Sequence, residues 1–216
     1  MMAELKIAET TLRINNIFCV ARNFVAHAAE MGSVIASEPV VFIKPNSAVL
    51  QSGSPVVLPS WSENVHHELE LVVAIAEGGK NIAPADALKH VAGYALGLDL
   101  TARDVQAAAK KTGSPWTLAK GFDGAAVLTQ FVAAGDIDPT QLQFTLHING
   151  ELRQSADTRL MAFDVATLIA WISSKFTLQA GDLIYTGTPE GVGQIQRGDH
   201  LRLTWPGRVE ESFDVI

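Results

Sequence analysis

The stretch that decides the fold is residues 66–76, His66-His67-Glu68-Leu69-Glu70-Leu71-Val72-Val73-Ala74-Ile75-Ala76. After Glu70 it is apolar without interruption and is followed by Gly78-Gly79, which is typical of a buried strand that ends in a turn. Side chains alternate along a strand, so Glu68 and Glu70 face the same way, about 7 Å apart. Buried carboxylates this close repel each other unless one is protonated or a cation lies between them. This stretch alone leaves open a divalent metal site and an edge strand whose acidic face lies in water.

Length and composition limit the class of protein. The chain has 216 residues, of which 48% are hydrophobic and 18% charged, which is ordinary for a globular enzyme domain. We therefore expect one domain over residues 1–216. A net charge of −7 with only 16 Lys and Arg argues against nucleic-acid binding. With no apolar run of membrane-spanning length and no signal core, the sequence predicts a cytoplasmic protein without a membrane partner.

The single cysteine, Cys19, excludes an intramolecular disulfide and a cysteine-based zinc site. It lies in the apolar run 17–20, which favours a buried thiol over a nucleophile.

Short strands dominate the predicted secondary structure. We expect strands over 5–7, 11–14, 17–20, 39–44, 91–100 and 181–186, and two more at the C-terminal end. Asn149-Gly150 predicts the tight turn of a hairpin over 146–153. The expected fold is mostly β with a few helices, an α+β class.

Four helices are predicted between these strands. The expected ranges are 24–31, 84–90, a helix from Thr101 to Lys111, and 166–176. Asn23 is the expected N-cap of the first, and Gly32 its end. Thr101, with Asp104 three residues later, predicts a capping box for the third.

Asp99 is a third acid at the end of an apolar strand. Glu68, Glu70 and Asp99 together offer only oxygen ligands, which suits Mg²⁺ or Mn²⁺ rather than zinc. His66 and His67 cannot both bind one ion there, because adjacent strand residues face opposite ways. We therefore expect at least one of these histidines to be structural.

Five motifs in register resemble the fumarylacetoacetate hydrolase family, over residues 17 to about 205. They are His67-Glu68-x-Glu70; Gly93-Tyr94 with Leu98-Asp99-x-Thr101-x-Arg103-Asp104-x-Gln106; Pro115-Trp116-x-x-Ala119-Lys120-x-Phe122-Asp123; Asn149-Gly150-Glu151-x-Arg153-Gln154; and Gly181-Asp182 with Thr186-Gly187-Thr188-Pro189-x-Gly191-Val192-Gly193. The resemblance is to the short, single-domain branch. It implies a mixed β-sheet roll around a central Mg²⁺ or Mn²⁺ held by Glu68, Glu70 and Asp99, and a homodimer.

The resemblance also assigns a lid helix at residues 23–32, on which His27, polarised by Glu30, activates water. From the residues alone, a histidine and a glutamate three apart are more often a surface ion pair. The family reads Gly-Arg-Asn-Tyr before this histidine, whereas this chain has Ala21-Arg22-Asn23-Phe24 and so lacks the tyrosine hydroxyl.

Five residues match family positions that contact substrate. They are Arg22, Arg103, Gln106, Lys120 and Thr188, and Lys120 is also expected to act in catalysis. From the residues alone, Lys120 is equally a surface lysine, and Arg103 and Gln106 a solvated helix face. The loop at 186–193 lacks the lysine of a phosphate-binding Walker motif, so it is either a plain tight turn or a turn that offers N–H groups to a carboxylate.

The implied activity is metal-dependent hydrolysis of acylpyruvates, such as acetylpyruvate or fumarylpyruvate, to pyruvate and a carboxylic acid. Decarboxylation or keto–enol tautomerisation of oxaloacetate is the alternative, because both also pass through a pyruvate-type enolate. The implied ligand in every case is a small 2-oxo acid. A non-catalytic module that binds a metal and an organic acid is the remaining alternative.

Overall fold

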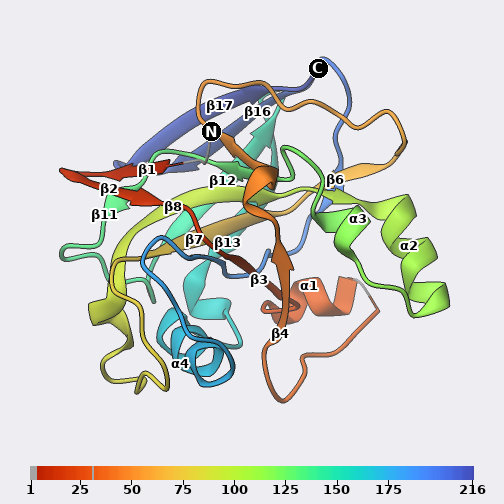
Figure 1. Ribbon diagram of the computed structural model, residues 1–216. Helices are drawn as coiled ribbons and strands as arrows, with labels where there is room; N and C mark the ends of the chain where they lie inside the picture. The colour runs from red at the N-terminus through yellow and green to blue at the C-terminus, as the bar shows by residue number, and fades with distance from the viewer. Residues whose placement is uncertain (1–3, 31) are drawn as a thin grey trace.

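The computed structural model describes residues 4–30 and 32–216 (Figure 1). Its strands are β1 (Glu4–Ile7), β2 (Thr10–Arg13), β3 (Ile17–Ala21), β4 (Val40–Lys44), β5 (Val49–Gln51), β6 (Val65–His67), β7 (Leu69–Ile75), β8 (Val91–Asp99), β9 (Thr101–Ala102), β10 (Ala126–Leu128), β11 (Val132–Ala133), β12 (Gln143–Ile148), β13 (Glu151–Asp157), β14 (Leu183–Tyr185), β15 (Gly193–Gln194), β16 (His200–Trp205) and β17 (Val209–Asp214). Its α-helices are α1 (Val25–Glu30), α2 (Arg103–Thr112), α3 (Thr117–Lys120) and α4 (Val165–Lys175), and its 3₁₀ helices are η1 (Asn46–Ala48), η2 (Ala87–His90) and η3 (Thr158–Leu160).

A curled, mixed sheet forms the centre of the molecule, in the order β4-β3-β14-β7-β8-β10-β5 with β11 paired to β8. β7 runs antiparallel to both of its neighbours, whereas β3 pairs parallel with β14 and β5 parallel with β10. Every residue of β7 is buried, as its continuous apolar run predicts. The edge-strand alternative for the two glutamates is therefore wrong, and the predicted mostly β fold is confirmed.

The second sheet has the order β13-β12-β16-β17, and buried and exposed residues alternate along its strands as in a half-solvated antiparallel sheet. Its β12–β13 hairpin turns at Asn149-Gly150, where φ is +54° and +85°. Positive φ at both central residues is typical of a type I′ turn, so the predicted hairpin is confirmed. In Figure 1, α2 and α3 lie together at one end of the main sheet, away from α4.

Two predicted helices differ from the structure. The 84–90 helix is reduced to the single 3₁₀ turn η2, Ala87–His90. α1 covers Val25–Glu30, and residue 31 of the predicted 24–31 range lies outside the described residues. No helix in the described ranges is both long and apolar enough to span a membrane. Cys19 is fully buried on β3 and burial raises its pKa, as expected for an inert thiol.

Both predicted N-terminal caps are wrong, because tertiary contacts take the capping side chains. Asn23 instead bonds across the chain to the carbonyls of Phe163 and Thr186 and to the N–H of Phe163. α2 starts after Ala102 with no side-chain cap. Asp104 accepts hydrogen bonds from the Ser62 hydroxyl and the Glu63 N–H, among others, rather than closing a capping box.

Candidate active site

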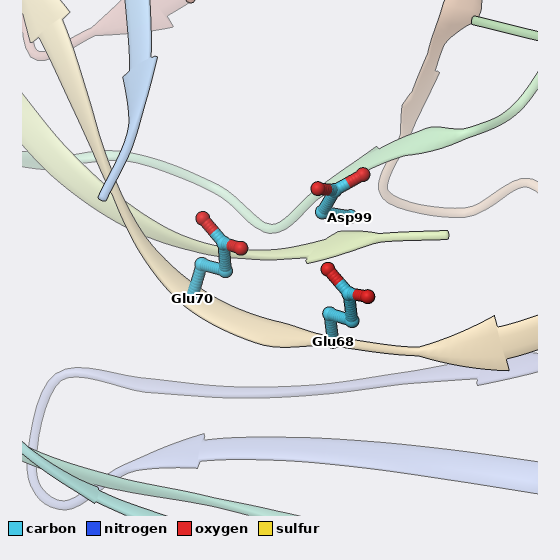
Figure 2. Close-up of side chains that lie close together, drawn as sticks. All are labelled: Glu68, Glu70 and Asp99. Atoms are coloured by element: carbon cyan, nitrogen blue, oxygen red, sulfur yellow. The ribbon is translucent and has the colours of Figure 1, made fainter. Parts of the chain in front are cut away.

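Three buried carboxylates meet where β7 and β8 run side by side. Glu68 lies at the break between β6 and β7, Glu70 on β7 and Asp99 at the end of β8. Figure 2 shows Glu68 and Glu70 on the same side of their strand, facing Asp99. One oxygen from each carboxylate lies within 4.8 Å of the others. The sequence-predicted ligand set is therefore brought together.

Two cations neutralise the outer part of this cluster. The Lys120 ammonium donates to Glu68 Oε2 and Asp99 Oδ2, both at 2.7 Å, and Arg103 Nη2 donates to Glu68 Oε1 at 2.6 Å. Burial opposes the charge of Glu68, but Lys120 and Arg103 outweigh it and hold its pKa well below the usual range. Burial likewise opposes the charge of Lys120, but Asp99 and Glu68 raise its pKa. The surface-lysine alternative for Lys120 is wrong.

Glu70 has a different environment. Its side chain accepts a hydrogen bond from the Gly187 N–H at 2.7 Å, and no Lys or Arg in the described ranges forms an ion pair with it. Burial, reinforced by the charges of Asp99 and Glu68, raises its pKa well above the usual range. This position requires glycine, which has no Cβ. Its φ is +99°, and a Cβ there would lie 2.7 Å from Asn23 Cβ.

The donor set fits Mg²⁺ or Mn²⁺. It consists only of oxygens, the ligands these ions prefer. Glu70 is also a buried carboxyl group that no cation in the described residues pairs with. A carboxylate oxygen has two lone pairs, so the contacts of Glu68 and Asp99 leave capacity for an ion. The neighbouring histidines serve elsewhere: His66 bonds Asn64, and buried His67 bonds Gln154.

His27 and Glu30 lie three residues apart on α1. His27 Nδ1 lies 3.2 Å from Glu30 Oε2, and the His27 side chain is 8% exposed. Both oxygens of Glu30 also accept from the Gly191 N–H, at 3.1 and 3.3 Å. The pair therefore joins the predicted lid to the glycine-rich loop and is more than a surface ion pair.

A cavity of about 160 Å³ lies between α1, α2 and the carboxylates. It contains all the predicted site residues except Glu30, which lies behind His27. Its lining residues are Val20, Ala21, Arg22, His27, Ser33, Phe42, Glu68, Glu70, Asp99, Arg103, Gln106, Lys110, Trp116, Lys120 and Thr188.

Three of the predicted substrate contacts, Arg103, Gln106 and Thr188, have protein partners. Arg103 Nη1 donates to Gln106 Oε1 at 2.7 Å, and Gln106 is only 3% exposed, so the solvated-face alternative is wrong. Thr188 Oγ1 accepts from Gln154 Nε2 at 2.8 Å, and the Gln154 oxygen accepts from the Leu69 N–H. Gln154 thus fixes the loop at 186–193 against the strand that carries Glu70.

The sequence reasoning missed Lys44, at the end of β4. Its side chain is completely buried, and its ammonium lies 2.7 Å from Asp99 Oδ1. The same group donates to the carbonyls of Leu100 and Lys120. The sequence does contain a signal for this ion pair, since Lys44 directly follows the apolar run 40–43. A lysine buried with such a run requires an acidic partner.

Lys44→Met is expected to lower the free energy of unfolding of the metal-free protein by about 3 kcal/mol, because it leaves a buried carboxylate short of a cation. Urea denaturation in the presence of a chelator measures the change. Lys80→Met is the matched control, since Lys80 donates to the Ser174 carbonyl at the surface and to no other group in the described part of the chain. It should change stability by less than about 0.5 kcal/mol. Equal effects of the two substitutions would contradict this account.

Known proteins match this chain over most of its length. The family model "Fumarylacetoacetate (FAA) hydrolase C-terminal" matches residues 16–213. The human protein named oxaloacetate tautomerase FAHD1, mitochondrial, is 45% identical over 201 residues, which are 93% of this chain and 91% of that protein. Oxaloacetate tautomerase YcgM from Escherichia coli is 43% identical over 196 residues, 90% of each chain.

A solved structure shares the fold over the whole chain. The crystal structure of fumarylpyruvate hydrolase from Pseudomonas aeruginosa in complex with Mn²⁺ and pyruvate matches with a TM-score of 0.94 and 38% identity. The match covers 100% of this chain and 96% of that one. That enzyme was solved with Mn²⁺, one of the two ions that the three carboxylates here suit.

Proposed function

Because the chain belongs to the fumarylacetoacetate hydrolase family, whose relatives named above are enzymes, we propose that it hydrolyses acylpyruvates to pyruvate and a carboxylic acid. One observation carries this proposal: His27, which is paired with Glu30, and the three-carboxylate cluster border the same cavity. That arrangement offers a base for water on one side and a site for a divalent ion on the other.

In the proposed reaction, the bond between C3 and C4 of the acylpyruvate breaks. Glu30 accepts the Nδ1–H of His27, which leaves Nε2 free to take a proton from water. The water oxygen adds to the distal carbonyl carbon, C4. The acyl group that contains C4 then leaves as the carboxylic acid. The electron pair of the broken bond goes to the pyruvate enolate, which takes at C3 the proton that His27 removed from water.

Glu68, Glu70 and Asp99 would hold the Mg²⁺ or Mn²⁺ ion, whose chemistry, when bound, is to polarise the 2-oxo acid and stabilise negative charge. Lys120 adds a buried positive charge next to this cluster and would stabilise the same developing enolate. Arg22, Arg103, Gln106 and Thr188 are proposed to bind and orient the substrate from the cavity wall.

Decarboxylation or tautomerisation of oxaloacetate is the second candidate. Two relatives are named oxaloacetate tautomerases, and both reactions need a stabilised enolate but no attacking water. A non-catalytic metal and organic-acid binding module would not need the His27–Glu30 pair beside the cluster, so this pair favours an enzyme.

We further propose that residues 1–216 act as one catalytic domain with residues 23–32 as its lid. A homodimer in the cytoplasm is the assembly and compartment that the family resemblance and the sequence favour. Light scattering of the purified chain and fractionation of cells that express it would test these two points.

A substrate panel tests the proposed function. Acetylpyruvate, fumarylpyruvate and oxaloacetate are assayed with Mg²⁺ and with Mn²⁺, by loss of enol absorbance and by identification of the products. We expect pyruvate and the matching carboxylic acid from the acylpyruvates, loss of activity after treatment with a chelator, and recovery when either ion is restored. Oxaloacetate turnover without any acylpyruvate hydrolysis would favour the second candidate, and no turnover of any substrate would favour the binding module.

A further inference from the structure

Four cationic side chains line the cavity, and they fall into two pairs. Arg103 and Lys120 are already bound to Glu68 and Asp99. In contrast, neither Arg22 nor Lys110 forms an ion pair or a hydrogen bond through its side chain within residues 4–30 and 32–216. Among the residues that the structure describes, the acids on the cavity wall are the three of the cluster. The part of the cavity outside the cluster therefore carries uncompensated positive charge.

Lys110 lies on the cavity-lining face of α2, further along the helix from the carboxylates than Arg103. Arg103, Gln106 and Lys110 are three and four residues apart, so they share one face of the helix, and all three line the cavity. At 1.5 Å per residue, Lys110 is about 10 Å further along the helix than Arg103. Its ammonium lies 5.6 Å from the centroid of the Trp116 ring, which also lines the cavity. This cation–π contact favours a position over the cavity wall rather than free movement in solvent.

Arg22 reaches the cavity from the segment before α1, with an unusual backbone. Its φ is +57°, a left-handed conformation that is uncommon for a residue other than glycine. Backbone strain of this kind is concentrated at ligand-binding and catalytic positions. Arg22 thus approaches the cavity from the segment between β3 and α1, whereas Lys110 approaches it from α2.

These cations also affect one another. Burial lowers the pKa of Lys110, and the nearby charges of Arg103, Lys120 and Arg22 lower it further. The chain as a whole is acidic, with a net charge of −7, so a local excess of positive charge must come from placement of these residues. An anion bound between Arg22 and Lys110 would relieve their repulsion.

We propose that Arg22 and Lys110 form a second carboxylate subsite, which makes the enzyme selective for acylpyruvates that carry a carboxylate at the end of the acyl chain. The inference rests on the proposed function, since it assigns the first carboxylate of the substrate to the cluster end of the cavity. Substrates with a distal carboxylate, such as fumarylpyruvate, are then preferred over neutral ones such as acetylpyruvate.

Binding of two matched ligands tests the subsite without turnover. 2-Oxoadipate and 2-oxohexanoate have the same chain length and differ only in the distal carboxylate, and neither has the 4-oxo group that hydrolysis requires. Calorimetric titration of the full chain with Mg²⁺ should show tighter binding of 2-oxoadipate. Lys110→Met should lower the ratio of the two affinities about fivefold, because a partly exposed ion pair contributes modestly. Lys110→Arg should retain the preference. Arg22→Met should lower it similarly.

Lys111→Met is the matched control, since Lys111 is an exposed neighbour on α2 that does not line the cavity. It should leave the preference intact, and higher ionic strength should narrow it. Equal affinities in the wild type, or equal weakening of both ligands by Lys110→Met, would overturn the subsite.

Kinetics separates this inference from the proposed function. In Lys110→Met, KM should rise for fumarylpyruvate and stay within twofold for acetylpyruvate. A wild type that hydrolyses neither compound but prefers 2-oxoadipate would refute the proposed function and support the subsite. Hydrolysis of both compounds with no preference in binding or KM would support the proposed function and refute the subsite.

Discussion

Glu70→Gln is expected to lower metal-dependent turnover by about 10³-fold while making the metal-free protein more stable at neutral pH. The loss of activity follows from the several kcal/mol that a bound divalent ion supplies to a developing negative charge. The gain in stability follows from removal of a buried carboxyl group whose ionised form no cation in the described residues pairs with. Glutamine is nearly the same size as glutamate and its oxygen can still accept the Gly187 N–H.

The direction of the pH dependence follows from the raised pKa of Glu70. The unfolded chain loses the Glu70 proton near pH 4.3, and the metal-free folded protein loses it only at higher pH. The contribution of Glu70 to stability is therefore present at low pH and is lost as the pH rises towards the folded pKa. Urea denaturation with a chelator between pH 5 and 8 should show this decline in the wild type and a smaller one in Glu70→Gln.

Glu68→Gln provides a control with the opposite sign. Lys120 and Arg103 hold the pKa of Glu68 well below the usual range, so the same substitution there removes a satisfied anion and should destabilise the protein at neutral pH. Added Mn²⁺ should stabilise the wild type and neither variant. A Glu70→Gln protein that is less stable than the wild type at pH 8 without metal would contradict this account of the cluster.

His27→Ala is the second substitution with a large expected effect. It should reduce kcat for acylpyruvate hydrolysis by 10² to 10⁴, the usual contribution of a general base, while oxaloacetate decarboxylation is partly retained because it requires no attacking water. Steady-state assays on both substrates measure the difference. Mn²⁺ affinity should not change, because His27 is not one of the three predicted ligands.

Glu30→Gln tests the partner of this base. The amide can still contact His27 and Gly191 but no longer supplies a negative charge to stabilise the imidazolium, so hydrolysis should fall less than in His27→Ala. Retention of full hydrolysis in His27→Ala would refute its role as the base. An equal fall in hydrolysis and decarboxylation would instead indicate a structural role.

Local patterns were sufficient for the features that depend on neighbouring residues. The unbroken apolar run after Glu70 predicted the interior strand β7, and Asn149-Gly150 predicted the turn between β12 and β13. Each signal lies within a few residues of the structure it specifies. The meeting of Glu68, Glu70 and Asp99 was also predictable, since β7 and β8 are successive strands and pair directly.

Contacts between distant segments were beyond such patterns. Asn23 and Asp104 have the residue types of helix caps, but partners more than 30 residues away in the chain compete for their side chains and win. Lys44 reaches Asp99 only because β4 folds beside the segment that follows β8. No periodicity in the sequence indicates which buried acid would neutralise that lysine.

Glu30 holds the imidazole of His27 and the Gly191 N–H with the same carboxylate. Gly191 cannot easily be replaced, because its φ is +88° and a Cβ would lie 2.4 Å from the Arg153 carbonyl oxygen. If residues 23–32 act as the proposed lid and swing away from this loop, Glu30 leaves Gly191 together with the helix that carries His27. We therefore expect cleavage by water to be restricted to the closed enzyme, so that the fraction of time spent closed limits hydrolysis and leaves loss of CO₂ from oxaloacetate comparatively unaffected.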